Sequence, residues 1–363
     1  MKLGVFMMPS HPPERGVYAS HNQDLDHLEL IDKLGYDEAW IGEHFLVPWE
    51  PIPAPDIMIA QALMRTKQIK LGAGVHNLPY HHPAELAHRI AYLDHLAQGR
   101  LYFGVGASGT VSDWVLFNVD GHSGENRKMS QESLDIILKI WENKGPFDYK
   151  GEYWHVTIPD TMYGVLKFWL TPYQKPHPPI GVAAASYKSP TMTFVGEKGY
   201  IALCLAFNVD YTRSQWEALE EGAKKAGTTY PRSKWRLVRN VIVADTDQEA
   251  RDLALNGMTA RFFREYMLHI YKASYGDFLQ CMKHDPNVPD DDVTPEYLAE
   301  HVWIMGSPET VAGQIRKLYE DVGGFGTLIV LTLDHADERV AWEKSARLLA
   351  EKVMPMLADL SPD

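Results

Sequence analysis

The feature that most constrains the fold is an alternation of short apolar runs with longer amphipathic stretches, repeated eight times along the chain. This alternation is typical of βα units built around a parallel sheet. Most of the short runs are continuously apolar, as expected for strands covered on both faces. The expected strands span residues 3–7, 38–41, 69–74, 101–105, 180–184, 201–205, 237–243 and 327–331. The sequence therefore predicts an α/β fold, namely a single (β/α)8 TIM barrel.

Helical patterns lie between these strands and follow the last one. One start is marked at Ser307-Pro308-Glu309 by a serine cap, a proline at the first helical position and an acid in the first turn. The expected helices span residues 24–34, 83–96, 130–141, 213–226, 247–255, 308–321 and 340–357. Helices on the outside let a parallel sheet of this size close on itself.

Two segments are longer than a minimal barrel requires. They cover residues 145–177, which include several proline and aromatic side chains, and residues 261–302. Insertions after barrel strands can build lids and substrate pockets, or they can elaborate the surface and contact a second subunit. We expect one domain over residues 1–363 that carries these two insertions.

Charge and apolar content exclude several classes of protein. Acidic residues outnumber basic ones by 48 to 35, a net charge of -13, so the chain lacks the basic footprint that nucleic acid binding needs. No apolar run approaches the roughly 20 residues that cross a bilayer. The N-terminus shows no export signal, so we expect a cytoplasmic protein without membrane contact. Cys204 and Cys281 are the only cysteines, and a disulfide scaffold is not expected.

Histidines follow four of the expected strands, at the end where a barrel of this kind carries its active site. They are His11, His44, His76 and His335. Imidazole is the side chain whose charge changes most easily near neutral pH, which suits proton transfer. Each one alone could be a structural histidine with satisfied hydrogen bonds. Four at one rim favour a mouth lined by histidines.

Imidazoles also bind metals, so a metal centre is the alternative interpretation of this rim. The sequence contains no H-E-x-x-H motif, no carboxylate at helical spacing from two histidines and no cluster of cysteine ligands. These are the patterns that would place several ligands around one ion. We therefore expect no metal at the site.

Two further segments after strands carry the marks of a ligand site. Gly104, Gly106 and Gly109 lack a Cβ and leave backbone against which a flat ring system could lie. Their spacing matches a dinucleotide fingerprint, but no doubly wound pattern follows, so we interpret the match as coincidental. Ser189 precedes Pro190 as the expected cap of a helix. The start of that helix is either an anion site or a plain capped end.

Several stretches together resemble the luciferase-like flavin-dependent oxidoreductases, and the resemblance runs essentially from Lys2 to Met356. They are specific to that family and much less specific to a substrate. The stretches that carry the resemblance are GYDEAWIGEH at 35–44, LGAGVHNLP at 71–79, HP at 82–83, GRLYFGVG at 99–106, PPI at 178–180 and GSPETV at 306–311.

The resemblance implies FMN across the barrel mouth, as reduced FMN delivered by a separate flavin reductase. Gly74 and Val75 match a cis peptide that packs under the flavin ring. Gly106 matches a position where some luciferases carry a reactive cysteine, which excludes flavin–thiol chemistry here. Arg127 and the segment 185–189 match the phosphate site. The expected cofactor-binding residues are Gly74, Val75, Gly106, Ala107, Arg127, Ala185, Ser186 and Ser189.

The same resemblance gives the catalytic candidates His44, Glu43 and His76. His44 matches the histidine that faces the reacting edge of the flavin. There it would act as an acid or base, or as a donor that holds the oxygen-transferring C4a-hydroperoxyflavin. Glu43 would orient His44 or bind the cofactor.

Two late segments resemble one branch of the family. GGFGTL at 323–328 and WEKS at 342–345 look like the branch that contains diketocamphane-type and limonene-type monooxygenases. This likeness implies Baeyer–Villiger or epoxidising chemistry, in which one oxygen atom of O2 enters a small apolar substrate such as a terpenoid or a cyclic ketone. The family also suggests a homodimer.

Three other functions stay open at this point. The same barrel could hold deazaflavin F420 in a reductase or dehydrogenase, although only Lys188 and Arg127 offer positive charge for its longer tail. It could bind flavin without catalysis, but Glu43, His44 and His76 together argue against that. A metal-dependent hydrolase is the third, and metal analysis of the purified protein would decide it.

Overall fold

The computed structural model describes residues 1–273 and 277–362. Eight parallel strands form a closed barrel, because the last strand pairs with the first and β3 pairs with β5. In order around the barrel they are β1 (Lys2–Ser10), β2 (Glu38–Ile41), β3 (Lys70–Ala73), β5 (Leu101–Gly106), β8 (Ile180–Ala184), β9 (Ile201–Cys204), β10 (Trp235–Arg239) and β13 (Thr327–Leu333). The predicted (β/α)8 barrel is confirmed.

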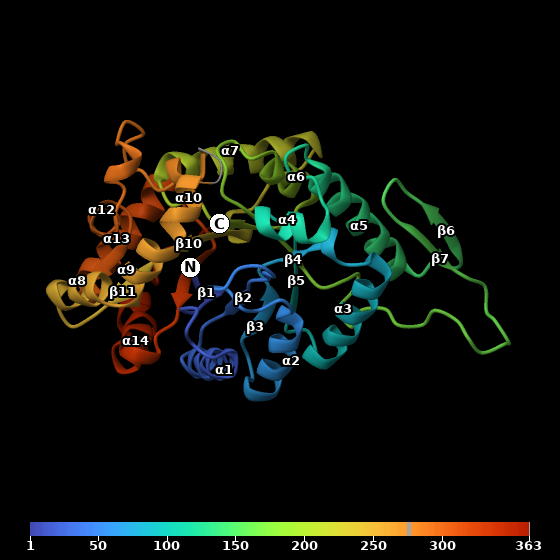
Figure 1. The fold of residues 1–363 in the computed structure, drawn as a ribbon, viewed down its shortest axis with the longest axis horizontal. Helices are drawn as coiled ribbons and strands as arrows, with labels where there is room; N and C mark the ends of the chain where they lie inside the picture. The colour runs from blue at the N-terminus through green and yellow to red at the C-terminus, as the bar shows by residue number, and fades with distance from the viewer. Residues whose placement is uncertain (274–276, 363) are drawn as a thin grey trace.

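Helices surround the strands (Figure 1). They are α1 (Val17–Lys33), α2 (Pro55–Arg65), α3 (Pro83–Ala97), α4 (Val111–Phe117), α5 (Glu125–Glu142), α6 (Pro190–Lys198), α7 (Val209–Lys225), α8 (Asp247–Asn256), α9 (Met258–Phe262), α10 (Leu268–Ala273), α11 (Asp277–Gln280), α12 (Pro295–His301), α13 (Pro308–Val322), α14 (Arg339–Leu348) and α15 (Met354–Met356). The sequence pattern missed α2, because Ile57 and Met64 are exposed on it and blur its apolar stripe. Across residues 1–273 and 277–362, none of these helices combines the length and the apolar character of a membrane span.

Strand pairing is interrupted near the carboxyl ends of two barrel strands. The strand expected over 237–243 divides at Asn240, and β11 (Val241–Val243) leaves the barrel to pair with β12 (Ile304–Gly306). The chain also breaks after β3, and the short β4 (His76–Asn77) resumes pairing with β5. Both breaks lie at the end of the barrel where an active site is expected.

Trp40 fills the interior of the barrel and is fully buried. Glycines make room for its ring, since a Cβ at Gly181 would lie 2.5 Å from the indole and one at Gly72 would lie 3.0 Å from it. Trp40 Nε1 donates to Glu38 Oε1 at 3.1 Å, and Arg236 pairs with the same carboxylate at 3.1 Å. Glu38 and Arg236 lie near the starts of β2 and β10, so side chains fill the amino end and leave the carboxyl end for a site.

The two segments expected as insertions lie in different places. Segment 145–177 includes an antiparallel hairpin that lies beyond α5 at the edge of the molecule (Figure 1). Its strands are β6 (Phe147–Lys150) and β7 (His155–Ile158). Segment 261–302 includes the π-helical turn η3 (Phe263–Met267), and its residues 274–276 lie outside the described residues. Tyr266 of η3 contacts Glu50 in the loop between β2 and α2.

Candidate active site

His44 follows β2 and lies between two buried carboxylates. Its Nε2 is 3.1 Å from Glu50 Oε2, and its Nδ1 is 3.5 Å from Asp113 Oδ2. The carboxylates are fully buried, whereas the His44 side chain remains 22% exposed. Burial alone would lower the pKa of His44, but Glu50 and Asp113 outweigh it and raise the pKa to about 10. The imidazole is therefore protonated at neutral pH and offers N–H groups rather than a lone pair.

Asp113 also folds the loop that carries His44. From the first turn of α4, its Oδ1 accepts from the backbone N–H of Leu46 at 2.8 Å, and its Oδ2 accepts from that of Phe45 at 3.4 Å. Thr110 Oγ1, just before α4, is 3.3 Å from His44 Nδ1. Glu50 and Asp113 were not expected from the sequence, because neither follows a strand directly and Asp113 comes from a distant helix.

Glu43 is buried, and its polar contacts are with residues other than His44, its neighbour in the sequence. Its carboxylate lies 3.2 Å from His76 Nδ1 and 3.0 Å from His81 Nε2, and it accepts from the backbone N–H of Asn77 at 3.1 Å. Burial would raise the pKa of Glu43, but hydrogen bonds from the two histidines lower it to about 2. Within the described residues, the polar partners of His44 do not include Glu43. The expected orientation of His44 by Glu43 is therefore wrong, because this carboxylate fixes β4 instead.

Glu43, His76 and His81 bring three potential metal-ligand atoms within 4.8 Å of one another. A fourth side chain, Arg89, contacts this cluster at His81. Arg89 Nη2 lies 3.4 Å from His81 Nδ1, and a guanidinium can only donate. His81 Nδ1 therefore accepts from Arg89, and His81 Nε2 donates to Glu43. The contacts among Glu43, His76 and His81 thus form a hydrogen-bond network.

The peptide between Gly74 and Val75 is cis, as the resemblance implies. The neighbouring glycines differ from expectation. A Cβ on Gly106 would lie 2.3 Å from Val75 Cγ2, and one on Gly104 would lie 1.7 Å from the carbonyl oxygen of Ala73. These two glycines do not leave open backbone, because they make room for Val75 and for β3. Of the three glycines, only Gly109 could carry a Cβ with no described atom within 4 Å of it.

The start of α5 is tied to the loop after β5. Asn126 Nδ2 donates to the carbonyl oxygens of Ala107 at 3.1 Å and Ser108 at 3.0 Å. Arg127, the next residue, is exposed in the first turn of α5. Among the described residues, no carboxylate lies within ion-pair distance of its guanidinium. Arg127 is thus available to an anion at the barrel mouth.

The start of α6 lies after the neighbouring strand β8, which pairs with β5. Ser189 is the cap residue by position, but its side chain makes no cap hydrogen bond, so the expected serine cap is absent. Ala185 is buried, Ser186 is half-buried, and Gln215 Nε2 donates to the Ser186 carbonyl oxygen at 3.2 Å. Pro190 has no N–H, and the N–H groups of Met192 and Thr193 donate to the Ser189 carbonyl oxygen at 2.9 and 3.2 Å. Within the described residues, the N–H of Thr191 is therefore the one in this first turn that remains for another acceptor.

The four histidines after strands do not line one open mouth. His11 is 2% exposed, His76 is 1% exposed and His335 is 7% exposed, so only His44 keeps appreciable exposure. His11 Nδ1 lies 2.7 Å from Asp334 Oδ2, and His335 packs against His27 at 5.1 Å between ring centres. The expectation is wrong for three of them, because nearby carboxylates and rings bury them.

The model of the luciferase-like monooxygenase family matches residues 1–324. The chain belongs to this family. It is 32% identical to 3,6-diketocamphane 1,6-monooxygenase of Pseudomonas putida over 98% of each chain. It is 30% identical to limonene 1,2-monooxygenase of Rhodococcus erythropolis over 99% of this chain and 88% of the relative. The solved structure of the oxygenating constituent of 3,6-diketocamphane monooxygenase from Pseudomonas putida, in complex with FMN, superposes with a TM-score of 0.91 at 31% identity over 98% of each chain.

This luciferase-like monooxygenase is therefore an enzyme of the flavin-dependent class. Beside His44 it carries a cluster of half-buried aromatic rings. Phe117 of α4 packs against Phe45 at 4.7 Å and stacks on Tyr80 at 4.3 Å between ring centres. Phe45 directly follows His44 in the sequence, so this apolar cluster lies next to the His44 backbone.

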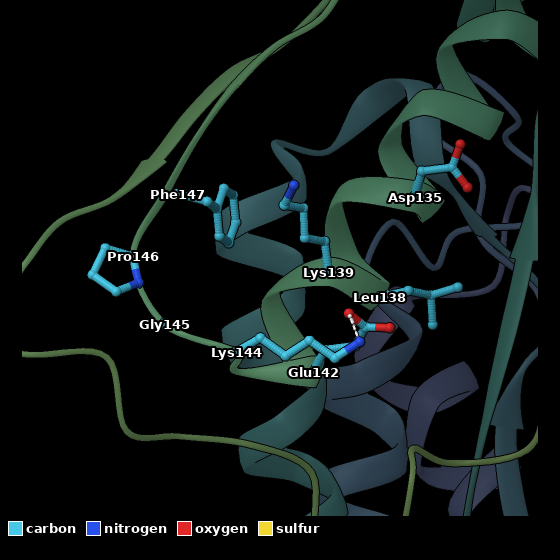
Figure 2. A pocket seen from close by; sticks show the side chains of 8 residues that line it. All are labelled: Asp135, Leu138, Lys139, Glu142, Lys144, Gly145, Pro146 and Phe147. Atoms are coloured by element: carbon cyan, nitrogen blue, oxygen red, sulfur yellow. Dashed lines mark ion pairs between the residues drawn. The ribbon is translucent and has the colours of Figure 1, made fainter.

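A groove of about 470 Å³ lies elsewhere, between the end of α5 and β6 (Figure 2). Lys144 pairs with Glu142 at 3.0 Å, and Lys139 Nζ lies 5.0 Å from the centre of the Phe147 ring. None of its lining residues follows a strand of the barrel. The groove in this luciferase-like monooxygenase is a feature of the surface and is not part of the His44 region.

Proposed function

We propose that the chain is the oxygenating component of a two-component monooxygenase, which uses reduced FMN and O2 to insert one oxygen atom into a small apolar substrate. The observation that carries this proposal is His44, which two buried carboxylates keep protonated at a partly exposed position. The activities named for the diketocamphane and limonene relatives support the reaction class. A separate flavin reductase belongs to the proposal, since the diketocamphane relative is named an oxygenating constituent.

The residues after β3, β5 and β8 fit FMN. Arg127 offers an unpaired guanidinium among the described residues. The start of α6 offers the Thr191 N–H and the hydroxyls of Ser186 and Ser189, which suit a phosphate. Val75, packed against Gly106, offers an apolar support for a flat ring. Bound reduced FMN supplies the electrons that activate O2, and the protein binds it, orients it and excludes water.

His44 acts as a donor of a hydrogen bond or a proton. Because its pKa lies near 10, the imidazolium dominates at neutral pH, which favours the donor role over that of a base. If His44 gives up a proton, Glu50 and Asp113 face a neutral ring with their charges unbalanced. This favours the return of a proton through the exposed edge of the ring.

Glu43 and His76 act as positioning residues in this proposal. Both are buried, and their contacts hold β4 and the backbone that follows the Gly74–Val75 peptide. They thereby fix the strand end on which Val75 is presented. A direct catalytic role for either stays a prediction.

The proposal includes an apolar substrate, because of the aromatic cluster of Phe45, Tyr80 and Phe117 beside His44. A ketone or alkene could pack against these rings while its reacting group faces the imidazolium. Hydrogen bonding to a carbonyl oxygen would favour a cyclic ketone.

The proposal also includes a homodimer. Exposed apolar side chains lie on two neighbouring helices, with Met64 88% and Ile57 58% exposed on α2, and Tyr92 60% and Leu96 52% exposed on α3. Apolar side chains gathered in this way mark surfaces that another protein covers. Sedimentation of the purified protein would show a dimer, which Met64→Glu should weaken.

The test of the proposed function combines the purified protein with reduced FMN, O2 and a panel of cyclic ketones and alkenes. The expected result is an oxygenated product that takes one labelled atom from 18O2. Absence of oxygenation across the panel together with turnover of reduced F420 would assign the chain to the F420-dependent alternative. FMN binding without any turnover would assign it to a flavin-binding protein.

A further inference from the structure

Tyr266 connects the second inserted segment to the His44 site. Its phenol donates to Glu50 Oε1 at 2.6 Å, and the other oxygen of the same carboxylate lies 3.1 Å from His44 Nε2. Glu50 is 1% exposed and therefore cannot exchange these partners for solvent. Within the described residues, Glu50 Oε2 has no hydrogen-bond partner, so its contact with His44 is an ion pair. The Glu50 carboxylate thus bridges Tyr266 and His44.

Local packing fixes the position of this phenol. Tyr266 lies in the π-helical turn η3, and π-helical turns occur often at functional sites because the extra residue re-aims a side chain. The Tyr266 ring stacks on Trp49 at 5.9 Å and packs against Phe262 at 5.4 Å between ring centres. These contacts hold the ring between the loop of Glu50 and the inserted segment. Burial and the nearby Glu50 raise the pKa of the Tyr266 phenol, so it remains a donor.

We propose that Tyr266 is a positioning residue for the monooxygenase reaction, which acts by fixing Glu50 so that Glu50 holds the His44 imidazole in its working orientation. The proposal rests on the proposed function for its catalytic meaning. The geometry also assigns the turn η3 a part in the site, in contrast to the hairpin of segment 145–177. Tyr266 acts through Glu50 and does not itself contact the reacting atoms.

The physical reason is the orientation of Glu50. The phenol holds one oxygen of the buried carboxylate, and the other oxygen then faces the imidazolium. Without the phenol, Glu50 Oε1 would be a buried acceptor with no donor among the described residues, which favours a turn of the carboxylate toward another donor. Its distance from His44 then increases, and the ion pair weakens. The other described groups that face His44 are Asp113 and Thr110. Within the described residues neither makes a hydrogen bond with Tyr266, although the charge of Asp113 acts on the phenol over a longer distance.

The experiment is an NMR titration of His44 in protein labelled with 15N-histidine, with the resonance assigned by its loss in His44→Gln. In Tyr266→Phe, we expect the pKa of His44 to fall by about one unit, the size of one hydrogen bond to a charged group. Tyr230→Phe is the matched control, because the Tyr230 hydroxyl also donates at 2.6 Å, to the Tyr200 carbonyl oxygen, and lies away from the site. That variant should leave the titration of His44 unchanged.

A second arm tests whether the effect passes through Glu50. In a Glu50→Gln background, adding Tyr266→Phe should shift the pKa of His44 no further, since the carboxylate that transmits the effect is gone. An equal shift in both backgrounds would overturn the proposal. So would an unchanged pKa in Tyr266→Phe alone, or loss of folding in Tyr266→Phe but not in Tyr230→Phe, which would assign Tyr266 to stability.

Activity gives the last readout. With reduced FMN and an accepted substrate, Tyr266→Phe should lower the yield of product per FMN oxidised, and this yield should fall at a lower pH than in the parent protein. Failure to find any oxygenated substrate would count against the proposed function only, because the titration of His44 needs neither FMN nor substrate. If the yield of product per FMN oxidised is unchanged at every pH while the pKa of His44 is shifted, Tyr266 has no part in the reaction.

Discussion

Two neighbouring strands end in the same arrangement, a histidine between two carboxylates, yet the two arrangements differ in exposure. After β1, His11 lies 2.7 Å from Asp334 and 3.0 Å from Asp24, and its side chain is 2% exposed. After β2, the corresponding distances of His44 are 3.1 and 3.5 Å, and its side chain is 22% exposed. The His11 arrangement has shorter distances and less exposure, and it is suited to stabilise the fold. The His44 arrangement has longer distances and more exposure, and it is suited to contact a ligand.

The partners of the two histidines support this division. Asp24 belongs to α1 and Asp334 follows β13, so His11 ties the first helix to the strand that closes the barrel. Asp334 is held further by Arg15 at 3.0 Å. Glu50, by contrast, contacts both His44 and Tyr266, and Tyr266 belongs to an inserted segment. A charged histidine at a strand end is therefore not a sign of catalysis unless part of its ring remains accessible.

The largest expected effect is on stability, from His11→Ala. This change leaves Asp24 buried without its cation, and breaking a buried ion pair in this way costs about 3–5 kcal/mol. Urea unfolding monitored by circular dichroism would measure it. His44→Ala should cost much less, because Asp113 and Glu50 each keep another hydrogen-bond donor. Equal losses in the two variants would remove the distinction between the sites.

The pH dependence of stability should follow from His11. Burial lowers its pKa, but Asp24 and Asp334 outweigh that effect and raise the pKa from 6.5 to about 9. A raised pKa in the folded state stabilises the protein fully below about pH 6.5, and this stability is lost as the pH rises through about 9. The stability difference between the parent protein and His11→Ala should therefore shrink by about 3 kcal/mol over that window. A difference that grows with pH would contradict the raised pKa.

His44→Ala should act on chemistry in a way that His11 does not. We expect product formed per FMN oxidised to fall roughly 100-fold, the size of a lost proton donor. Affinity for reduced FMN should be retained, because Arg127 and the start of α6 are untouched. Product analysis and a binding titration would measure the two quantities. Unchanged coupling would show that His44, like His11, is structural.

The smallest expected effect concerns the phosphate site. Arg127→Ala should weaken FMN binding by about tenfold, the loss of one charged hydrogen bond. Lys128→Ala is the matched control, since it removes a neighbouring exposed cation from the same helix turn. Fluorescence quenching of FMN would measure both. A larger effect from Lys128→Ala would show that Lys128, rather than Arg127, contacts the phosphate.

Local patterns predicted the fold well. The eight strands and most helices could be read from the sequence because each buried strand is a continuous apolar run and each outer helix has an apolar stripe. The break at Asn240 and the helices α2, α4, α9, α10, α11 and α12 were missed. At Asn240 and in α2 the local pattern is weak, since apolar residues continue across Asn240 and lie on the exposed face of α2.

The site could be predicted only in part, because its decisive contacts are long-range. His44 was found from its position after β2, but its partners Glu50 and Asp113 depend on how the loop and α4 fold back. Gly106 looked like open backbone, and only the position of the Val75 side chain reveals the close contact. Tyr266 carried no signal at all, since nothing local distinguishes it from other tyrosines on helices.

The most direct measurement is the ionisation of His44 in the unmodified protein without ligand. Its ring nitrogens, followed by 15N NMR from pH 5 to about pH 10, should show an imidazolium at neutral pH that loses its proton only near the upper end, in line with the pKa of about 10. A ring that is already neutral at about pH 7 would contradict the account, because the paired carboxylates would then not supply the protonated donor on which the proposed chemistry depends.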